Sequence, residues 1–212
     1  MPTPVHLCDR FPQVPAADLL AGFATPPHFS HARFTTYVPD PGAPSQAAAL
    51  ASLEAFATSV NAGSHGANKR FRFGPRRRPN DEGKVGVYLD GGYGVGKTHL
   101  LASLWFATQP AGQRAYGTFV EYTNLVGALG FEQTVEALSP YALVCIDEFE
   151  LDDPADTVLM STPPGRLAVH GVRLAATSNT LPDKLGEGRF AADDFLREIQ
   201  GLAARFEVLR ID

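Results

Sequence analysis

GGYGVGKT, at residues 91–98, is the stretch that decides the fold of this chain. It fits the pattern G-x-x-x-x-G-K-[ST], which forms a phosphate-binding loop between a strand and a helix. Both neighbours are predicted here, because an apolar run at 85–90 indicates a buried strand and the sequence at 97–108 indicates a helix. The sequence therefore predicts a nucleotide-binding P-loop made of Gly91, Gly92, Tyr93, Gly94, Val95, Gly96, Lys97, Thr98 and His99.

The spacing of this motif suits a polyphosphate. Glycines let backbone N–H groups approach the phosphate oxygens and adopt positive φ. The N-terminus of the following helix adds free amides and the positive end of its dipole. We expect Lys97 to reach the β- and γ-phosphates and Thr98 to supply a hydroxyl ligand to Mg²⁺. The alternative, a glycine-rich turn that fits by chance, is disfavoured by the strand before it and the helix after it.

Composition limits the class of protein. The chain has 212 residues, of which 44% are hydrophobic, and a net charge of −5. This length allows one domain with a substantial core, and the acidic balance argues against a globally basic nucleic-acid-binding protein. Cys8 and Cys145 lie far apart, so we expect no disulfide framework and a cytoplasmic location. We expect no secretory signal and no transmembrane segment, because no apolar run approaches membrane-spanning length.

The chain divides into three predicted parts. Residues 1–62 form the first part, which consists of a proline- and aromatic-rich segment at 1–44 lying over a domain and a helix over Ser45–Val60. Residues 63–84 form a linker with a basic run at 69–78, which could bind single-stranded nucleic acid but is more typical of a solvated loop. Residues 85–212 form the P-loop core. The buried face of the first helix is expected to hold Leu50, Leu53, Ala57 and Val60, with Phe56 beside them.

From residue 85 onward, strand and helix patterns alternate, which favours a parallel sheet. The expected strands are 85–90, 116–121, 142–147, 172–177 and 206–211. The expected helices are 97–108, 122–129, 154–162 and 192–204. The predicted fold class is α/β, a five-stranded parallel sheet sandwiched by helices as in P-loop nucleoside triphosphatases, with an N-terminal extended and helical appendage.

Polar side chains follow two of the predicted strands. Asp147 ends the third strand and is expected to hold Mg²⁺, directly or through water, while Glu148 is expected to act as general base on the attacking water. Acids are common where a buried strand meets solvent, so this pattern gains weight only from the upstream P-loop. After the fourth strand, Asn179, with Ser178 second, is predicted to sense the γ-phosphate. A polar turn without this role is an equal alternative.

Phosphoryl transfer often uses an arginine that a neighbouring subunit supplies. Three candidates follow the fourth strand: Arg189, Arg197 and Arg205. A solvated surface position is the simpler interpretation of each. Arg205 ranks first as a catalytic arginine because it stands directly before the last predicted strand.

The motifs resemble those of AAA+ ATPases, beginning with GGYGVGKTHLLAS at 91–103. Three further segments narrow the resemblance to the ZapE-like cell-division ATPases, relatives of a mitochondrial ATPase: FVEYTNLV at 119–126, CIDEFELDDP at 145–154 and TSNTLP at 177–182. ARFTTY at 32–37 also fits the N-terminal part of that family. The resemblance implies ATP and Mg²⁺ binding, ATP hydrolysis in a ring-like homo-oligomer, and action on a protein partner, which in bacteria would be the division ring.

Two features depart from the family pattern. Family members continue past the position of Asp212 into a helical lid, so we expect a nucleotide site without that lid and without a second arginine sensor. In addition, Pro163 and Pro164 interrupt what should be a continuous helix. A proline inside a helix costs about 3 kcal/mol or more, so we expect the helix to end near Thr162 or the region to be remodelled.

Three functions are consistent with these patterns. The first is an ATPase of the ZapE-like group. The second is a nucleotide-binding module without turnover, suggested by the expected loss of the lid. The third is a DNA-associated loader or initiator ATPase, because GKTHL at 96–100 also occurs in that AAA+ group. The segments at 32–37 and 149–154 favour the first.

Overall fold

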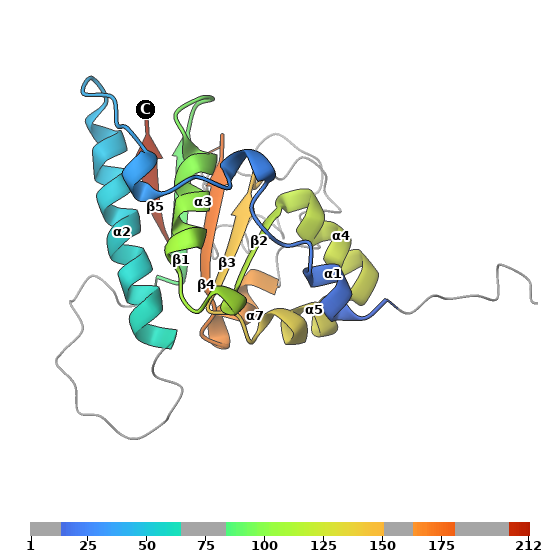
Figure 1. Cartoon of the computed structure of the whole chain (residues 1–212). Coiled ribbons are helices and arrows are strands. Elements are labelled where there is room, and N and C mark those ends of the chain that lie inside the picture. The colour runs from blue at the N-terminus through green and yellow to red at the C-terminus, as the bar shows by residue number, and fades with distance from the viewer. Residues whose placement is uncertain (1–13, 65–83, 151–162, 181–203) are drawn as a thin grey trace, which may run out of the picture.

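The computed structural model describes residues 14–64, 84–150, 163–180 and 204–212. The strands are β1 (Gly86–Gly91), β2 (Arg114–Thr118), β3 (Leu143–Asp147), β4 (Arg173–Ser178) and β5 (Phe206–Ile211). The α-helices are α1 (Ala16–Leu20), α2 (Pro44–Ser64), α3 (Lys97–Ala107), α4 (Phe119–Leu129), α5 (Phe131–Leu138) and α7 (Pro163–Val169). Short 3₁₀ turns are η2 (Pro27–Phe29), η3 (Phe34–Thr36) and η4 (Ala111–Gln113). Figure 1 shows this arrangement.

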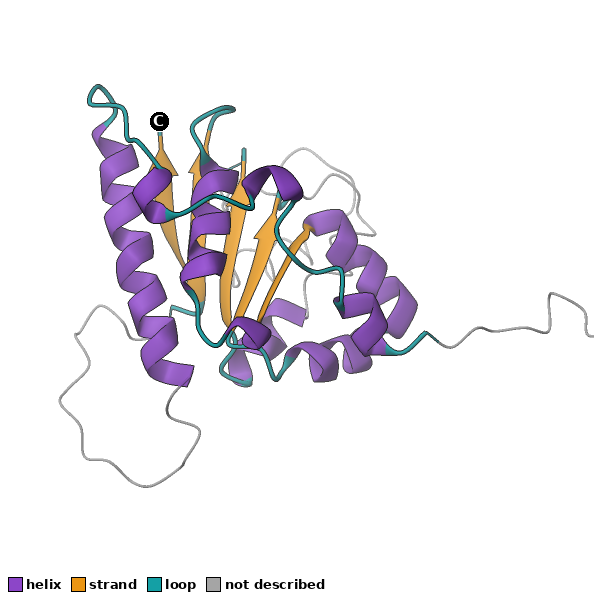
Figure 2. Ribbon diagram, in the orientation of Figure 1, coloured by secondary structure: helices purple, strands orange, loops and turns teal. Residues whose placement is uncertain are grey.

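The five strands form one parallel sheet in the order β2-β3-β4-β1-β5. The predicted α/β fold with a five-stranded parallel sheet is therefore confirmed. Strand β1, which leads into the P-loop, lies inside the sheet between β4 and β5. Because all strands run the same way, their carboxyl ends meet at one edge (Figure 2).

Helices cover both faces of the sheet, because successive strand side chains point to opposite faces. On β3, Cys145 belongs to the cluster that includes α2 and α3, whereas Val144 and Ile146 belong to the cluster that includes α4, α5 and α7. We call these the α3-side and α4-side clusters. The continuous apolar strands thus reflect burial on both faces, as is typical of parallel sheets.

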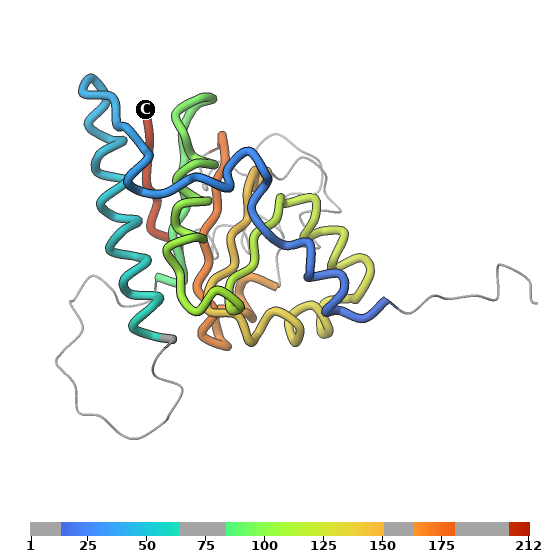
Figure 3. The backbone as a smooth tube through the Cα atoms, viewed as in Figure 1, coloured from blue at the N-terminus to red at the C-terminus, as the bar shows by residue number. Residues whose placement is uncertain are grey.

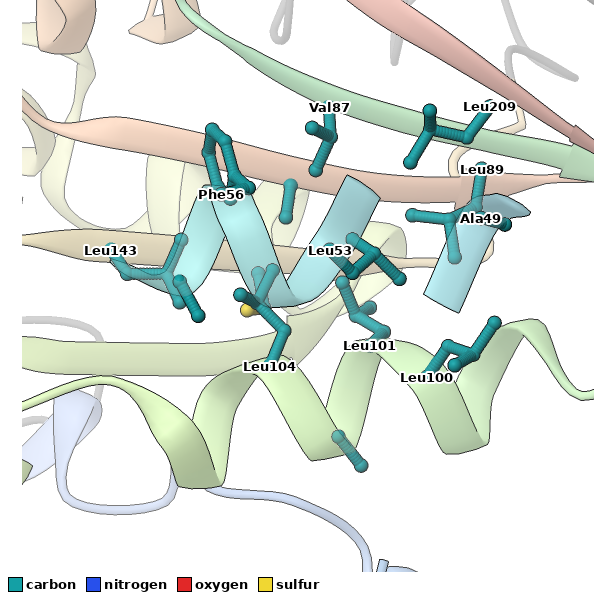
Figure 4. Packing of buried hydrophobic residues seen from close by; sticks show 14 of the residues in the cluster. Ala49, Leu53, Phe56, Val87, Leu89, Leu100, Leu101, Leu104, Leu143 and Leu209 are labelled. Atoms are coloured by element: carbon teal, nitrogen blue, oxygen red, sulfur yellow. The ribbon is translucent and has the colours of Figure 1, made fainter. Parts of the chain in front are cut away.

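Helix α2 packs closely against the sheet and α3. Leu53 is fully buried in the α3-side cluster, together with Leu100 and Leu101 of α3 and Val87 of β1 (Figure 4). The predicted helix over Ser45–Val60 is confirmed, with Leu53, Phe56, Ala57 and Val60 buried and Leu50 partly buried. The helix therefore shares one hydrophobic core with the strands.

The segment that precedes α2 contains short helical elements as well as extended chain. Figure 3 shows it running from α1 across α3 to the start of α2. At the edge of the sheet, the backbone N–H of Tyr116 on β2 donates to the carbonyl of Phe23 at 3.0 Å. The segment therefore covers part of an edge strand whose backbone groups would otherwise be unpaired.

Several predicted bounds were wrong. The second strand is Arg114–Thr118, not 116–121, because Thr118 caps α4: its hydroxyl accepts the N–H of Glu121, whose carboxylate in turn accepts the N–H of Thr118. Helix α5 was not predicted. Nor was α7, in which Pro163 and Pro164 occupy the first turn, where proline is tolerated.

Some predictions lie outside the described residues. These are the helices at 154–162 and 192–204, the end of the former near Thr162, the basic run at 69–78, and Cys8.

Cys145 is a free, buried thiol on β3. None of the described helices is both long enough and apolar enough to cross a membrane.

Truncating Leu53 to alanine should lower the free energy of unfolding by about 2–5 kcal/mol, because it leaves a cavity between α2, α3 and the sheet. Urea denaturation followed by circular dichroism measures this change. The matched control is Glu54→Ala, the exposed neighbour on the same helix, which should change stability by less than about 0.5 kcal/mol. Equal stability of the two variants would show that α2 is not part of the cooperative core.

Candidate active site

The P-loop occupies the turn between β1 and α3. Gly91 ends the strand, Gly94 and Gly96 have φ of 81° and 88°, and α3 begins at Lys97. Only glycine adopts such φ values without strain, which explains its use at both positions. Beside the loop is a pocket of about 250 Å³. It is lined by Phe29, Tyr93, Gly94, Gly96, Lys97, Thr98, His99, Glu148, Thr177, Ser178 and Asn179.

The ammonium group of Lys97 lies at the centre of a hydrogen-bond network. It donates to the carbonyls of Gly91 and Gly92, both at 2.7 Å, and to Oδ1 of Asn179 at 2.9 Å. The amide nitrogen of Asn179 in turn donates to Oε1 of Glu150 at 2.7 Å. Asn179 therefore bridges the P-loop lysine and a carboxylate beyond β3.

The charge of Lys97 is balanced by nearby acids. Burial lowers the pKa of its ammonium group below the ordinary value, while the carboxylates around it oppose that shift. The acids that raise its pKa are Asp90, Asp147, Glu150 and Glu148. Lys97 thus lies among several carboxylates beside the pocket, as in a site for a phosphate and a metal ion.

Asp147 is buried at the carboxyl end of β3, with only 5% of its surface exposed. Its Oδ1 accepts the hydroxyl of Thr98 at 3.3 Å, and its Oδ2 accepts the phenol of Tyr116 at 2.7 Å. Burial and the nearby carboxylate raise the pKa of Tyr116 far above its ordinary value, so the phenol keeps its proton. The carboxylate lies beside the first turn of α3, where the helix dipole favours negative charge.

Glu148 has an unusual backbone. Its φ is 54°, in the left-handed region that residues with a side chain rarely adopt. Such a conformation costs on the order of 1–3 kcal/mol and persists only where the surroundings impose it. The side chain is exposed and lines the pocket. The strand end therefore turns one carboxylate inward at Asp147 and the next toward the pocket.

The N-terminal segment lies directly on the P-loop. The hydroxyl of Tyr37 donates to the carbonyl of Val95 at 2.9 Å, and its ring covers Gly96 so closely that a Cβ there would come within 2.6 Å. His99 Nε2 lies 3.0 Å from Oγ1 of Thr36. The predicted loop residue His99 therefore faces this segment as well as the pocket.

Arg205, the arginine candidate within the described residues, does not line this pocket. Arg205 stands at the amino end of β5, where its carbonyl accepts the N–H of Val85. From there to the level of Gly91 is six residues of strand, or roughly 20 Å, along the sheet. Arg205 therefore lies at the end of the sheet opposite the P-loop. Arg189 and Arg197 lie outside the described residues.

The chain matches a known protein family over most of its length. The family model described as AFG1-like ATPase matches residues 14–212. The chain belongs to the AFG1-like ATPase family. Sequence relatives agree with this assignment: the cell division protein ZapE of Escherichia coli strain K12, and that of strain O157:H7, are each 27% identical over 137 residues. That match covers 60% of this chain and 36% of each relative, so the AFG1-like chain matches about a third of their length.

Solved structures show the same fold. DnaA of Aquifex aeolicus bound to AMPPCP matches with a TM-score of 0.61 at 12% identity, over 86% of this chain and 50% of that chain. A DnaC helicase loader matches with a TM-score of 0.58 at 18% identity, over 88% of this chain and 100% of that chain. Identities this low show only that the AFG1-like chain shares its fold with these proteins.

The structure brings Lys97, Thr98, Glu148, Ser178 and Asn179 to one pocket, with Asp147 bonded to Thr98. Sequence reasoning missed five residues of the AFG1-like site: Phe29, Tyr37, Tyr116, Glu150 and Thr177. A signal existed for Glu150, which lies two residues beyond the predicted base. Tyr116 and Thr177 sit inside apolar strands, where a tyrosine or threonine is ordinary, so their polar role had no local signal.

Replacing Lys97 with alanine should weaken nucleotide binding by about a hundredfold or more, because a desolvated, charge-assisted contact with the phosphates is lost. Titration with a fluorescent ATP analogue measures the affinity, and circular dichroism checks the fold. Lys84→Ala is the matched control, because Lys84 donates to carbonyls at the amino end of β5, away from the P-loop. Unchanged affinity in Lys97→Ala would contradict the assignment of this pocket.

Proposed function

We propose that this chain binds ATP with Mg²⁺ and hydrolyses it. The observation that carries the proposal is the convergence of Lys97, Thr98, Glu148 and Asn179 on one pocket beside the P-loop. These residues come from three separate elements, β1–α3, β3 and β4, and each has the chemistry that its role requires. Membership of the AFG1-like ATPase family supports the same reaction.

The P-loop would hold the triphosphate. Lys97 now donates to two loop carbonyls, and phosphate oxygens would replace these weaker acceptors. The amides at the start of α3 would complete the cradle. Gly96, with its positive φ and the ring of Tyr37 against it, fixes the last turn before the helix.

Thr98 and Asp147 fit a magnesium site. Their hydroxyl and carboxylate oxygens lie 3.3 Å apart, and oxygen is the ligand that Mg²⁺ prefers. Mg²⁺ held there would offset the negative charge of the β- and γ-phosphates. A site with one protein carboxylate and a hydroxyl is typical of Mg²⁺ bound together with phosphates.

Glu148 would act as general base. Its exposed carboxylate lines the pocket and would accept a proton from the water that attacks the γ-phosphorus. Asn179, already bonded to Lys97, would contact the γ-phosphate or orient that water. An arginine such as Arg205, supplied by a neighbouring copy in a ring-like homo-oligomer, would stabilise the transferred charge.

We further propose that hydrolysis drives action on a protein partner in the cytoplasm, with cell division as the process. Support comes from the relatives named cell division protein ZapE. A DNA loader or initiator function rests on the GKTHL motif at 96–100 and on the shared fold with DnaA and DnaC, and the basic run that would serve it lies outside the described residues. A nucleotide-binding module without turnover is the alternative that the next experiment separates.

The purified 212-residue chain should hydrolyse ATP at a rate that rises more than linearly with protein concentration, because a residue supplied in trans completes the site only in the oligomer. Phosphate release across a concentration series measures this, and Lys97→Ala is the inactive control. ATP binding without phosphate release at the highest concentration would instead support a binding module.

Replacing Glu148 with glutamine should keep ATP binding and lower kcat by about 10²–10⁴-fold, because the amide keeps the shape of the side chain but cannot accept the proton. Steady-state hydrolysis and nucleotide titration on the same preparation separate the two effects. Glu136→Gln, on α5, is the control. Normal turnover by Glu148→Gln would remove Glu148 from the mechanism.

A further inference from the structure

Four polar side chains meet on one face of the sheet at its carboxyl edge. On β3 and β4, Cys145 and Ala175 belong to the α3-side cluster, so the strand alternation places Asp147 and Thr177 on that same face. Tyr116 of β2 also belongs to the α3-side cluster. Thr98, in the first turn of α3, lies above them. The sheet therefore gathers these groups under the start of α3.

Tyr116 reaches Asp147 along the sheet. Its Cα pairs with Cys145, two residues before Asp147, a distance of roughly 6.6 Å along the strand. The long phenol side chain spans that gap, and its hydroxyl donates to Oδ2 of Asp147 at 2.7 Å. A shorter side chain at this position could not make the contact.

Thr177 holds the other oxygen of Asp147. Its hydroxyl donates to Oδ1 at 2.5 Å, and Thr98 donates to the same oxygen at 3.3 Å. Both carboxylate oxygens are thus engaged by hydroxyl donors on the described chain. The buried carboxylate is oriented before any ligand arrives, which lowers the cost of ordering it when the site fills.

Thr177 also accepts a hydrogen bond from the backbone at Glu148, the residue that follows Asp147. Its hydroxyl oxygen accepts the backbone N–H of Glu148 at 3.0 Å, and its carbonyl accepts the N–H of Phe149 at 2.7 Å. These two bonds bracket Glu148, the described residue other than glycine with a positive φ. One threonine on β4 therefore connects the Asp147 carboxylate to the backbone of the general base.

We infer that Thr177 is a positioning residue that fixes Glu148 relative to Asp147, and that Tyr116 is a second positioning residue that acts on Asp147 alone. The inference rests on the proposed function of these two acids. It assigns different consequences to the two hydroxyls: loss of either disturbs the metal-binding carboxylate, but loss of the Thr177 hydroxyl also releases the base.

Three variants test this assignment: Tyr116→Phe, Thr177→Val and Thr177→Ser. Tyr116→Phe keeps the ring, Thr177→Val keeps the shape, and Thr177→Ser keeps the hydroxyl. The controls are Tyr122→Phe and Thr134→Val, which remove hydroxyls from a buried tyrosine and a buried threonine away from the pocket. Circular dichroism and thermal unfolding confirm that each variant folds.

The first readout is the Mg²⁺ concentration that half-maximally supports binding of a fluorescent, non-hydrolysable ATP analogue. We expect Tyr116→Phe and Thr177→Val each to raise it by about 10–100-fold, the usual effect of losing a hydrogen-bond partner behind a metal ligand. Thr177→Ser should restore the wild-type value to within about threefold. The controls should leave it unchanged.

The second readout is kcat at saturating Mg²⁺. Thr177→Val should lower kcat about 10–100-fold more than Tyr116→Phe does, because it also removes the hydrogen bond that the backbone N–H of Glu148 donates to the threonine hydroxyl. Equal kcat in the two variants would overturn the division of roles.

These readouts separate two failures. If the wild type binds the analogue but does not hydrolyse ATP, the proposed function fails, while the Mg²⁺ dependence still tests the positioning of Asp147. If the Mg²⁺ dependence of Tyr116→Phe and Thr177→Val matches that of the wild type, the inference is wrong, whatever the turnover. If Thr177→Val does not fold, Tyr116→Phe and Thr177→Ser still decide the first readout.

Discussion

The parallel pairing of β1 with β4, and of β4 with β3, is the constraint on which the candidate site depends. It brings the carboxyl ends of three strands to one edge, so that the P-loop, Glu148 and the polar end of β4 line a common pocket, with Asp147 buried beside it. Ligands of open parallel sheets bind at this edge because the loops that leave the strands converge there. The site therefore depends on pairing between strands that are far apart in the sequence.

The buried carboxylate of Asp147 is the most demanding group in this arrangement. Removing a carboxylate from water is costly unless hydrogen bonds replace its solvation. Tyr116, Thr98 and Thr177 provide those bonds from a strand, a helix and another strand. The same bonds fix the orientation of the carboxylate, so the energetic requirement of burial and the geometric requirement of a metal ligand are met by one set of contacts.

The N-terminal segment is part of the site as well as a cover over the sheet. Phe23 pairs with the edge strand β2, His99 meets Thr36, and Tyr37 bonds to Val95 inside the P-loop. The segment therefore connects α2, which shares the core with α3, to the loop that would bind phosphate. The family match includes this segment, since it begins at residue 14.

The sequence by itself determined the P-loop, its flanking strand and helix, the acids Asp147 and Glu148, and the parallel α/β fold, because each depends on local patterns of a few residues. It placed the start of α4 too late, since the capping pair of Thr118 and Glu121 was not recognised. Only the tertiary structure decided that Tyr116 and Thr177 hold Asp147, and that Tyr37 contacts the loop. Those contacts join residues that are about 30 to 60 positions apart, and the order of strands in a sheet is set by packing between elements, which no local pattern records.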